Sequence, residues 1–120
     1  NILGQVAATA ALNECDDWLN NFLGHLQSMR DLTVNELNKL PGITCEMPEG
    51  CYLAFADIRQ TGLDSSAMHE KLLKEAKVAV VPGLEQWFGA GAKGYIRLSF
   101  ATSESILRQA FERIKIVLNT

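Results

Sequence analysis

The sequence lacks the features that mark several classes of protein. The formal net charge is −3 and no block of lysine and arginine is present, so counterion release cannot drive binding to nucleic acid. No apolar run approaches the roughly eighteen residues that a helical membrane span needs. The first residues lack the basic and apolar segments of a secretory signal, and there is no initiator methionine. We therefore expect neither nucleic-acid nor membrane partners, and a chain that is a fragment or a processed product.

Cysteine and histidine are scarce as well. The cysteines Cys15, Cys45 and Cys51 are odd in number and lack C-x-x-C spacing. This pattern predicts buried, reduced thiols in a cytoplasmic protein rather than a disulfide framework. His25 and His69 have no partners at metal-ligand spacing, so we expect no metal site. Both lie among polar residues in expected helices, where a solvated imidazole is the simpler interpretation than a catalytic one.

The sequence has the composition of a globular protein and begins with a segment of helical pattern. Hydrophobic residues make up 48% and charged residues 21% of 120 residues, which indicates one folded domain. Residues 1–40 are predicted to form one long helix, with a kink near Gly24 or at residues 31–33. The spacing of Thr33 and Glu36 fits either a helix restart or ordinary helix surface. We expect the stripe Trp18–Phe22 to lie in the core, because its apolar residues recur at helical spacing: Cys15, Trp18, Leu19, Phe22, Leu23, Leu26 and Met29.

Short strands and helices are expected after Pro41-Gly42, which ends the first helix. Apolar and alternating runs predict strands at residues 43–46, 51–57, 78–81 and 95–100, the second of them buried on both faces. Helices are expected to begin at Asp64 or Ser65 and at Thr102 or Ser103. The fold class predicted is therefore α+β: a small sheet of about four short strands, covered on one face by helices. Residues 1–40 and 41–120 are expected to form one structural unit.

A glycine-rich loop precedes the last strand. Residues 89–94 match the G-x-G-x-x-G spacing of dinucleotide-binding proteins. That fingerprint requires the glycines to follow a strand and open a helix, so that phosphate meets the helix N-terminus. Here they lead into a strand, and we interpret them as a tight, flexible approach to it.

Arg97 stands in the middle of this last strand between apolar neighbours. Alternation places Tyr95, Arg97 and Ser99 on one face of the strand and the apolar residues 96, 98 and 100 on the other. The apolar face is expected to pack on the helices, which leaves Arg97 on the opposite face. Two interpretations are open: an ordinary half-exposed arginine, or a bidentate clamp for a carboxylate, which suits the guanidinium fork.

Three blocks of sequence resemble the C-terminal part of the class I/II aminotransferase superfamily, the fold-type-I pyridoxal-phosphate enzymes. They are Pro48–Leu53 (PEGCYL), Val78–Gly83 (VAVVPG), and Phe88-Gly89 with Gly94–Ala101 (GYIRLSFA). In this order and spacing they cover essentially the whole chain. Several stretches resemble the cystathionine β-lyase-like (C–S lyase) branch: residues 1–4, Trp18-Leu19, residues 49–53, 57–59 and 62–63, and Trp87-Phe88-Gly89. Residues 81–83 and 99–102 are instead similar to ordinary aminotransferases.

The resemblance implies a role for Arg97 as the residue that binds the α-carboxylate of an amino-acid substrate. It also implies Tyr52, Trp87 and Phe88 at the rim of the active site. The implied cofactor is pyridoxal 5′-phosphate, which acts as an electron sink. The implied partners are the large cofactor-binding domain of the same chain and a second subunit in a homodimer. The parent activity is expected to be that of an aminotransferase or a C–S β-lyase.

The lysine that carries the cofactor in this family lies upstream, and no lysine here occupies such a segment. We therefore expect this chain to be a small domain with its linking helix, which by itself neither holds the cofactor nor catalyses a reaction. The alternative is a stand-alone, non-catalytic interaction module that works through the alanine-rich start of its first helix, residues 6–11, or through the face of Tyr95 and Arg97.

Overall fold

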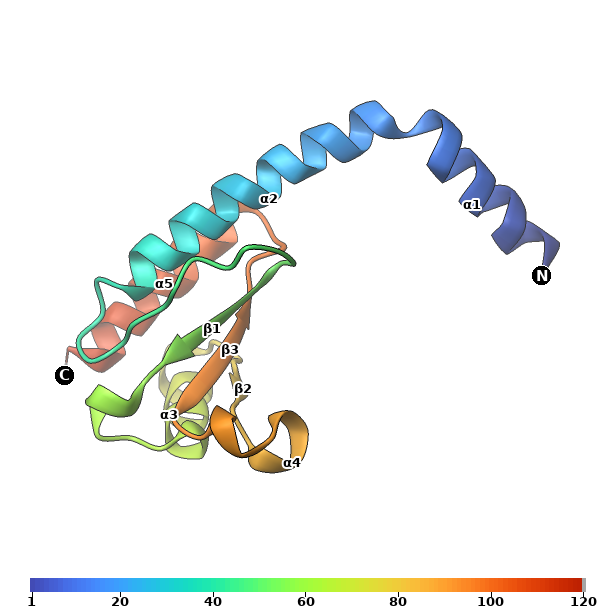
Figure 1. The fold of residues 1–120 in the computed structure, drawn as a ribbon. Coiled ribbons are helices and arrows are strands. Elements are labelled where there is room, and N and C mark those ends of the chain that lie inside the picture. The colour runs from blue at the N-terminus through green and yellow to red at the C-terminus, as the bar shows by residue number, and fades with distance from the viewer. Residues whose placement is uncertain (120) are drawn as a thin grey trace.

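The computed structural model describes residues 1–119, which form five α-helices, a three-stranded sheet and short helical turns (Figure 1). Two helices form a long arm, and the remaining elements form a compact α+β unit beside its C-terminal half. The elements are α1 (Ile2–Glu14), α2 (Asp16–Leu37), β1 (Leu53–Asp57), η1 (Arg59–Thr61), α3 (Ser65–Lys71), η2 (Leu72–Ala76), β2 (Val81–Pro82), α4 (Glu85–Phe88), η3 (Ala90–Ala92), β3 (Tyr95–Ser99) and α5 (Glu104–Leu118).

The N-terminal helix is divided at Cys15, and not at Gly24 or residues 31–33 as expected. Cys15 leaves the helical region with φ −113° and ψ 21°, and Asp16 and Asp17 follow in the first turn of α2. Carboxylates favour a helix start because they complement the positive end of the helix dipole. Thr33 lies inside the uninterrupted helix α2, so the capping-box spacing there is ordinary helix sequence. The division of the chain at residue 40 stays a prediction.

The sheet has three antiparallel strands in the order β1-β3-β2, one fewer than expected. Residues 43–46 contribute only an isolated bridge between Thr44 and Asp57. The pairing stops there because the next backbone groups, those of Cys45, are bound by the side-chain amide of Asn38 at 2.8 and 2.9 Å. The strand β2 is short for a similar reason. The Val78 N–H donates to Leu72 at 3.1 Å, and the Val80 carbonyl lies 2.6 Å from a ring nitrogen of His69.

One face of the sheet carries the core, against α2, α3 and α5. The expected alternation in β3 is confirmed, since Ile96 and Phe100 are buried and Leu98 packs against the same cluster. In β1, Ala54 and Ala56 are buried but Phe55 is 38% exposed. The expectation that residues 51–57 are buried on both faces was therefore wrong, because the helices that form the core, α2, α3 and α5, cover only one side of this antiparallel sheet.

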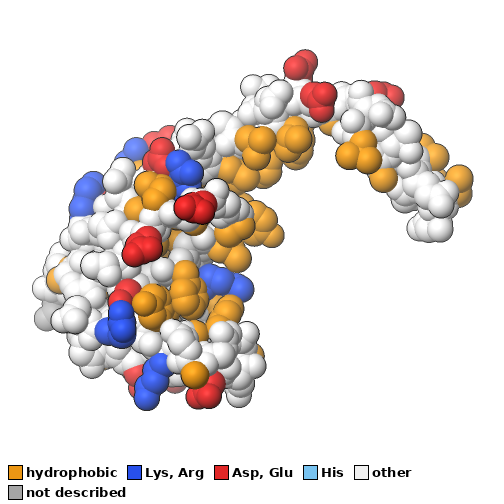
Figure 2. Space-filling model, viewed as in Figure 1, with side chains coloured by type: hydrophobic (Ala, Val, Ile, Leu, Met, Phe, Trp, Pro, Cys, Tyr) orange, Lys and Arg blue, Asp and Glu red, His pale blue; other side chains and the backbone are white. Residues whose placement is uncertain are grey.

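The arm formed by α1 and the first half of α2 is exposed, and α1 contains no buried residue. Trp18 is 64% exposed and stacks on Phe22 at 5.1 Å between ring centroids. The expectation that Trp18–Phe22 lies in the core was wrong, because no other described element packs on this part of α2. Figure 2 shows hydrophobic side chains gathered on the underside of the arm. The exposed apolar residues of the arm include Ile2, Leu3, Val6, Leu12, Trp18, Leu19 and Leu23.

The C-terminal half of α2 is fixed to the compact unit by both apolar and charged contacts. Met29, Val34 and Leu37 are buried in the core cluster. Glu36 is also buried, and its carboxylate pairs with Lys39 at 2.6 Å and with Lys115 of α5. This ion pair joins α2 to α5, which lie side by side in Figure 1.

Candidate functional site

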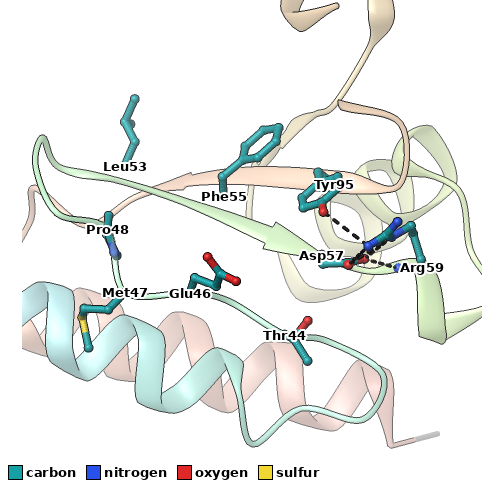
Figure 3. A pocket seen from close by; sticks show the side chains of 9 residues that line it. All are labelled: Thr44, Glu46, Met47, Pro48, Leu53, Phe55, Asp57, Arg59 and Tyr95. Atoms are coloured by element: carbon teal, nitrogen blue, oxygen red, sulfur yellow. Dashed lines mark hydrogen bonds and ion pairs between the residues drawn. The ribbon is translucent and has the colours of Figure 1, made fainter. Parts of the chain in front are cut away.

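The uncovered face of the sheet brings the candidate site residues together. Cross-strand pairs place Leu53 opposite Ser99, Phe55 opposite Arg97 and Asp57 opposite Tyr95, while Val81 of β2 flanks Arg97 on the other side. Because side chains alternate along a strand, the odd-numbered residues of β1 and β3 all project from this face. Figure 3 shows Leu53 and Phe55 pointing away from the helices.

Arg97 occupies the centre of this face, on the middle strand. It is half-buried, and its guanidinium carbon lies 5.3 Å from the centroid of the Phe88 ring. Within residues 1–119 no carboxylate lies at ion-pair distance from it. A half-buried guanidinium without an acidic partner retains its full set of N–H donors for an external anion.

A row of aromatic rings runs across the same face. Phe88 of α4 packs on Phe55 with 5.7 Å between ring centroids, and Phe55 stacks on Tyr95 at 5.0 Å with 6° between the ring planes. Such offset contacts stabilise by about 0.5–1.5 kcal/mol beyond the burial of area. The rings form an apolar floor beside Arg97, which lowers the competition from water for its charge.

An ion pair closes the row at its far end. The Arg59 guanidinium binds both carboxylate oxygens of Asp57, with 3.0 Å from Nε to each, and Nη2 lies 3.4 Å from the Tyr95 hydroxyl. These hydrogen bonds from Arg59 hold the pKa of Asp57 below its usual value. Sequence reasoning did not select this pair. The pair could have been found from the position of Asp57 opposite Tyr95, but that position is known only once the register of the strands is known.

A hollow of about 490 Å³ lies between this end of the face and the segment from Thr44 to Pro48 (Figure 3). Phe55 and Tyr95 belong to both the aromatic row and the hollow, so the two features are continuous. The lining combines apolar and charged side chains: Thr44, Glu46, Met47, Pro48, Leu53, Phe55, Asp57, Arg59 and Tyr95.

The three expected rim residues lie in different places. Phe88 contacts Arg97 directly. Trp87 is 57% exposed and lines a separate hollow with His69 and Val80. Tyr52 is 51% exposed and immediately precedes β1, where its carbonyl accepts a hydrogen bond from the Phe100 N–H. The structure thus brings only Phe88 to the arginine, and the rim role of all three stays a prediction.

The glycine loop lies where the sequence indicated, before β3. Gly89 and Gly94 both adopt positive φ, of 84°, and the Gly94 N–H donates to the buried hydroxyl of Ser65 at 3.0 Å. Gly83 allows a close backbone approach, since a β-carbon there would lie 2.1 Å from the Ala92 carbonyl oxygen. These glycines therefore shape the turn between β2 and β3.

The histidines are bound to backbone carbonyls. His25 is exposed, with Nε2 2.9 Å from the Thr102 oxygen, and His69 is half-buried beside Val80.

All three cysteines are free thiols, but only Cys45 is buried, so the expectation of buried thiols was wrong for Cys15 and Cys51. Burial raises the pKa of the Cys45 thiol. No group of metal-ligating side chains occurs within residues 1–119, and no helix of that range is long and apolar enough to cross a membrane.

The fit of the face to a pyridoxal-phosphate cofactor can be tested on its residues. None of β1, β2 and β3 contains a lysine. Four lysines outside the sheet pair with carboxylates: Lys39 and Lys115 with Glu36, Lys71 with Glu75 and Lys74 with Glu70. The three strands therefore place no lysine on the open face of the sheet, and we derive no step through the cofactor.

The chain is thus an α+β domain whose sheet carries, on its open face, an arginine with no acidic partner within residues 1–119. The model of a known family, Aminotransferase class I and II, matches residues 1–114. The chain belongs to this family.

Named relatives agree on the family and differ in activity. The aspartate aminotransferase of Pyrococcus horikoshii is 34% identical over 95% of this chain and 29% of its own length. The crystal structure of an aromatic aminotransferase from P. horikoshii has a TM-score of 0.86 and 38% identity, over 96% of this chain and 31% of the other. A protein of Corynebacterium diphtheriae, provisionally described as a PLP-dependent beta-cystathionase, has a TM-score of 0.88 and 34% identity, over 98% of this chain and 31% of the other. The chain thus spans less than a third of these proteins.

Proposed function

We propose that this chain is the small C-terminal domain of a pyridoxal-phosphate-dependent enzyme that acts on amino acids, and that Arg97 binds the α-carboxylate of the substrate. The observation that carries the proposal is the position of Arg97: it is half-buried on the open face and has no acidic partner within residues 1–119. A charged hydrogen-bond donor is stabilised when its acceptor is an anion, and a bidentate carboxylate matches the guanidinium fork.

The remainder of the active site is expected on a larger domain of the same protein and on a second subunit of a homodimer. The cofactor, when bound there, supplies an electron sink for chemistry at the substrate Cα. The contribution of the present chain is orientation, since fixing the carboxylate on Arg97 limits the rotation of the substrate. The isolated chain is expected to be inactive. A cytoplasmic location also stays a prediction.

The parent reaction is either transamination or C–S β-elimination. Relatives of similar identity are described as an aspartate aminotransferase, an aromatic aminotransferase and, provisionally, a beta-cystathionase. The α-carboxylate is common to the amino-acid substrates of both reactions, so the role of Arg97 is the same in either.

The experiment compares the complete protein with its Arg97→Ala and Arg113→Ala variants. Activity is followed with an amino donor and a 2-oxo acid, and separately with cystathionine as a source of pyruvate and ammonia. Arg97→Ala is expected to lower kcat/KM, because a charge-assisted pair is lost. The corresponding loss of transition-state stabilisation is about 2–5 kcal/mol. Arg113 is an exposed residue of α5, so its replacement should leave kcat/KM unchanged.

Two results would contradict the proposal. An Arg97→Ala variant with the kcat/KM of the parent would refute the carboxylate-binding role. A complete protein without activity in either assay would favour the stand-alone interaction module.

A further inference from the structure

Within residues 1–119, Arg97 is not held by an ion pair, unlike three other arginines of this chain. Arg30, Arg59 and Arg108 each pair with a carboxylate of a nearby residue. The cross-strand neighbours of Arg97 are instead Phe55 and Val81, both apolar. A contact that restricts the long, flexible side chain would favour anion binding, because an arginine that moves freely loses more entropy when it binds.

The ring of Phe88 provides this contact. The Arg97 guanidinium carbon lies 5.3 Å from its centroid, within the range at which a cation is attracted to the face of a ring. The ring itself is restrained because it packs on Phe55, which stacks on Tyr95. The orientation of Arg97 is thereby connected to the aromatic row on the open face.

The backbone also fixes the position of Phe88. Its N–H donates to the Leu84 carbonyl at 3.0 Å, and the Gly89 N–H donates to the Glu85 carbonyl at 2.8 Å. These bonds close the single turn of α4, and Gly89 with φ +84° ends it immediately after Phe88. The positive φ allows the chain to turn into the loop while the Phe88 ring stays over the sheet.

A ring and a carboxylate restrain an arginine with different consequences. An acidic partner would occupy the N–H donors and neutralise the charge, and a ligand would have to displace it. A ring attracts the cation through its face and accepts no conventional hydrogen bond, so the donors stay available. We propose that Phe88 is a positioning residue for Arg97, which holds the guanidinium ready for the substrate carboxylate; this inference rests on the proposed function.

The first test examines the contact in the chain of 120 residues, by NMR of the arginine side chains. The Arg97 side-chain protons are expected to show an upfield ring-current shift. Phe88→Leu should remove this shift and lower the order parameter of the Arg97 Nε–Hε group, whereas Phe88→Tyr should retain both. Phe88 is 38% exposed, so both variants are expected to fold. Identical Arg97 signals and order parameters in the parent and Phe88→Leu would overturn the inference.

The second test uses the complete enzyme and asks how strongly it prefers an amino acid to the corresponding amino-acid amide. Phe88→Leu should reduce this preference in kcat/KM by about three- to tenfold, chiefly through KM, with Phe88→Tyr close to the parent. A general loss of structure would lower kcat for both substrates and leave the ratio unchanged. Arg97→Ala serves as the reference variant, because it should abolish the preference.

The outcomes separate the two proposals. Loss of preference in Arg97→Ala with full preference in Phe88→Leu overturns the positioning role and leaves the function of Arg97 intact. Full preference in Arg97→Ala overturns both. A reduced preference in Phe88→Leu that Phe88→Tyr restores supports both.

Discussion

The buried carboxylate of Glu36 offers the sharpest test of how the helices are held together. Its side chain is 11% exposed and binds Lys39 of the turn after α2 and Lys115 of α5. Hydrogen bonds from the two lysines lower its pKa from the ordinary value of 4.5, with Lys115 the larger cause. Glu36→Gln keeps the shape and one acceptor oxygen but removes the charge.

The expected cost at pH 7 is about 1–2 kcal/mol of unfolding free energy. Charge-assisted hydrogen bonds contribute about 1.5–3 kcal/mol each when well buried. The lysines are 62% and 39% exposed, which weakens both pairs through solvent screening, so we take a value well below the sum. The matched control is Glu70→Gln. Glu70 pairs with Lys74 on the exposed surface of α3 and η2, and its replacement should change stability little.

The pH dependence has a definite sign. Because the pKa of Glu36 is lowered in the folded state, the unfolded chain binds more protons just below pH 4.5. The stabilisation is therefore fully present above that pH and is lost as the pH falls through the folded-state pKa. Urea unfolding of the parent and Glu36→Gln, from pH 7 down to about pH 3, should show a difference that shrinks below pH 4.5. A difference that is zero at pH 7, or constant over the range, would refute the reasoning.

Two further substitutions test the packing. The Thr33 hydroxyl is buried without a hydrogen-bond partner among the described residues, so Thr33→Val should raise the unfolding free energy by about 1 kcal/mol, and Thr33→Ser should lower it. A lower value for the valine variant in urea unfolding would show that the hydroxyl is satisfied. Gly83→Ala should cost at least about 2 kcal/mol, because its β-carbon would lie 2.1 Å from the Ala92 oxygen. Gly91→Ala, with nothing within 4 Å of its β-carbon, should be nearly neutral in the same assay, and equal effects would contradict this account.

Period-two patterning was sufficient to predict the face on which Arg97 lies. The run from Tyr95 to Phe100 alternates strictly, and alternation fixes which residues share a side of a strand. The α+β class was predicted from the order in which helical and alternating apolar patterns follow one another along the chain. The family resemblance then suggested the proposed ligand, the α-carboxylate of an amino acid, which the spacing alone left open.

Other features depended on contacts that a sequence does not display. The spacing of Trp18 and Phe22 identifies an apolar side of α2 but cannot show whether another element covers it. The bond from Asn38 to Cys45, which stops a fourth strand, joins a helix end to a loop. The contact between Phe88 and Arg97 depends on a single turn of helix whose position follows from the loop geometry.

The exposed arm has a thermodynamic consequence. No side chain of α1 is buried, and the buried residues of α2 begin only at Met29. A solitary helix of 13 residues is marginally stable in water, so α1 is expected to open and close independently of the compact unit. Chemical denaturation of this chain then reports on the part that begins near Met29, while amide hydrogens of the arm exchange through local fraying. A single free energy of unfolding describes only part of the molecule.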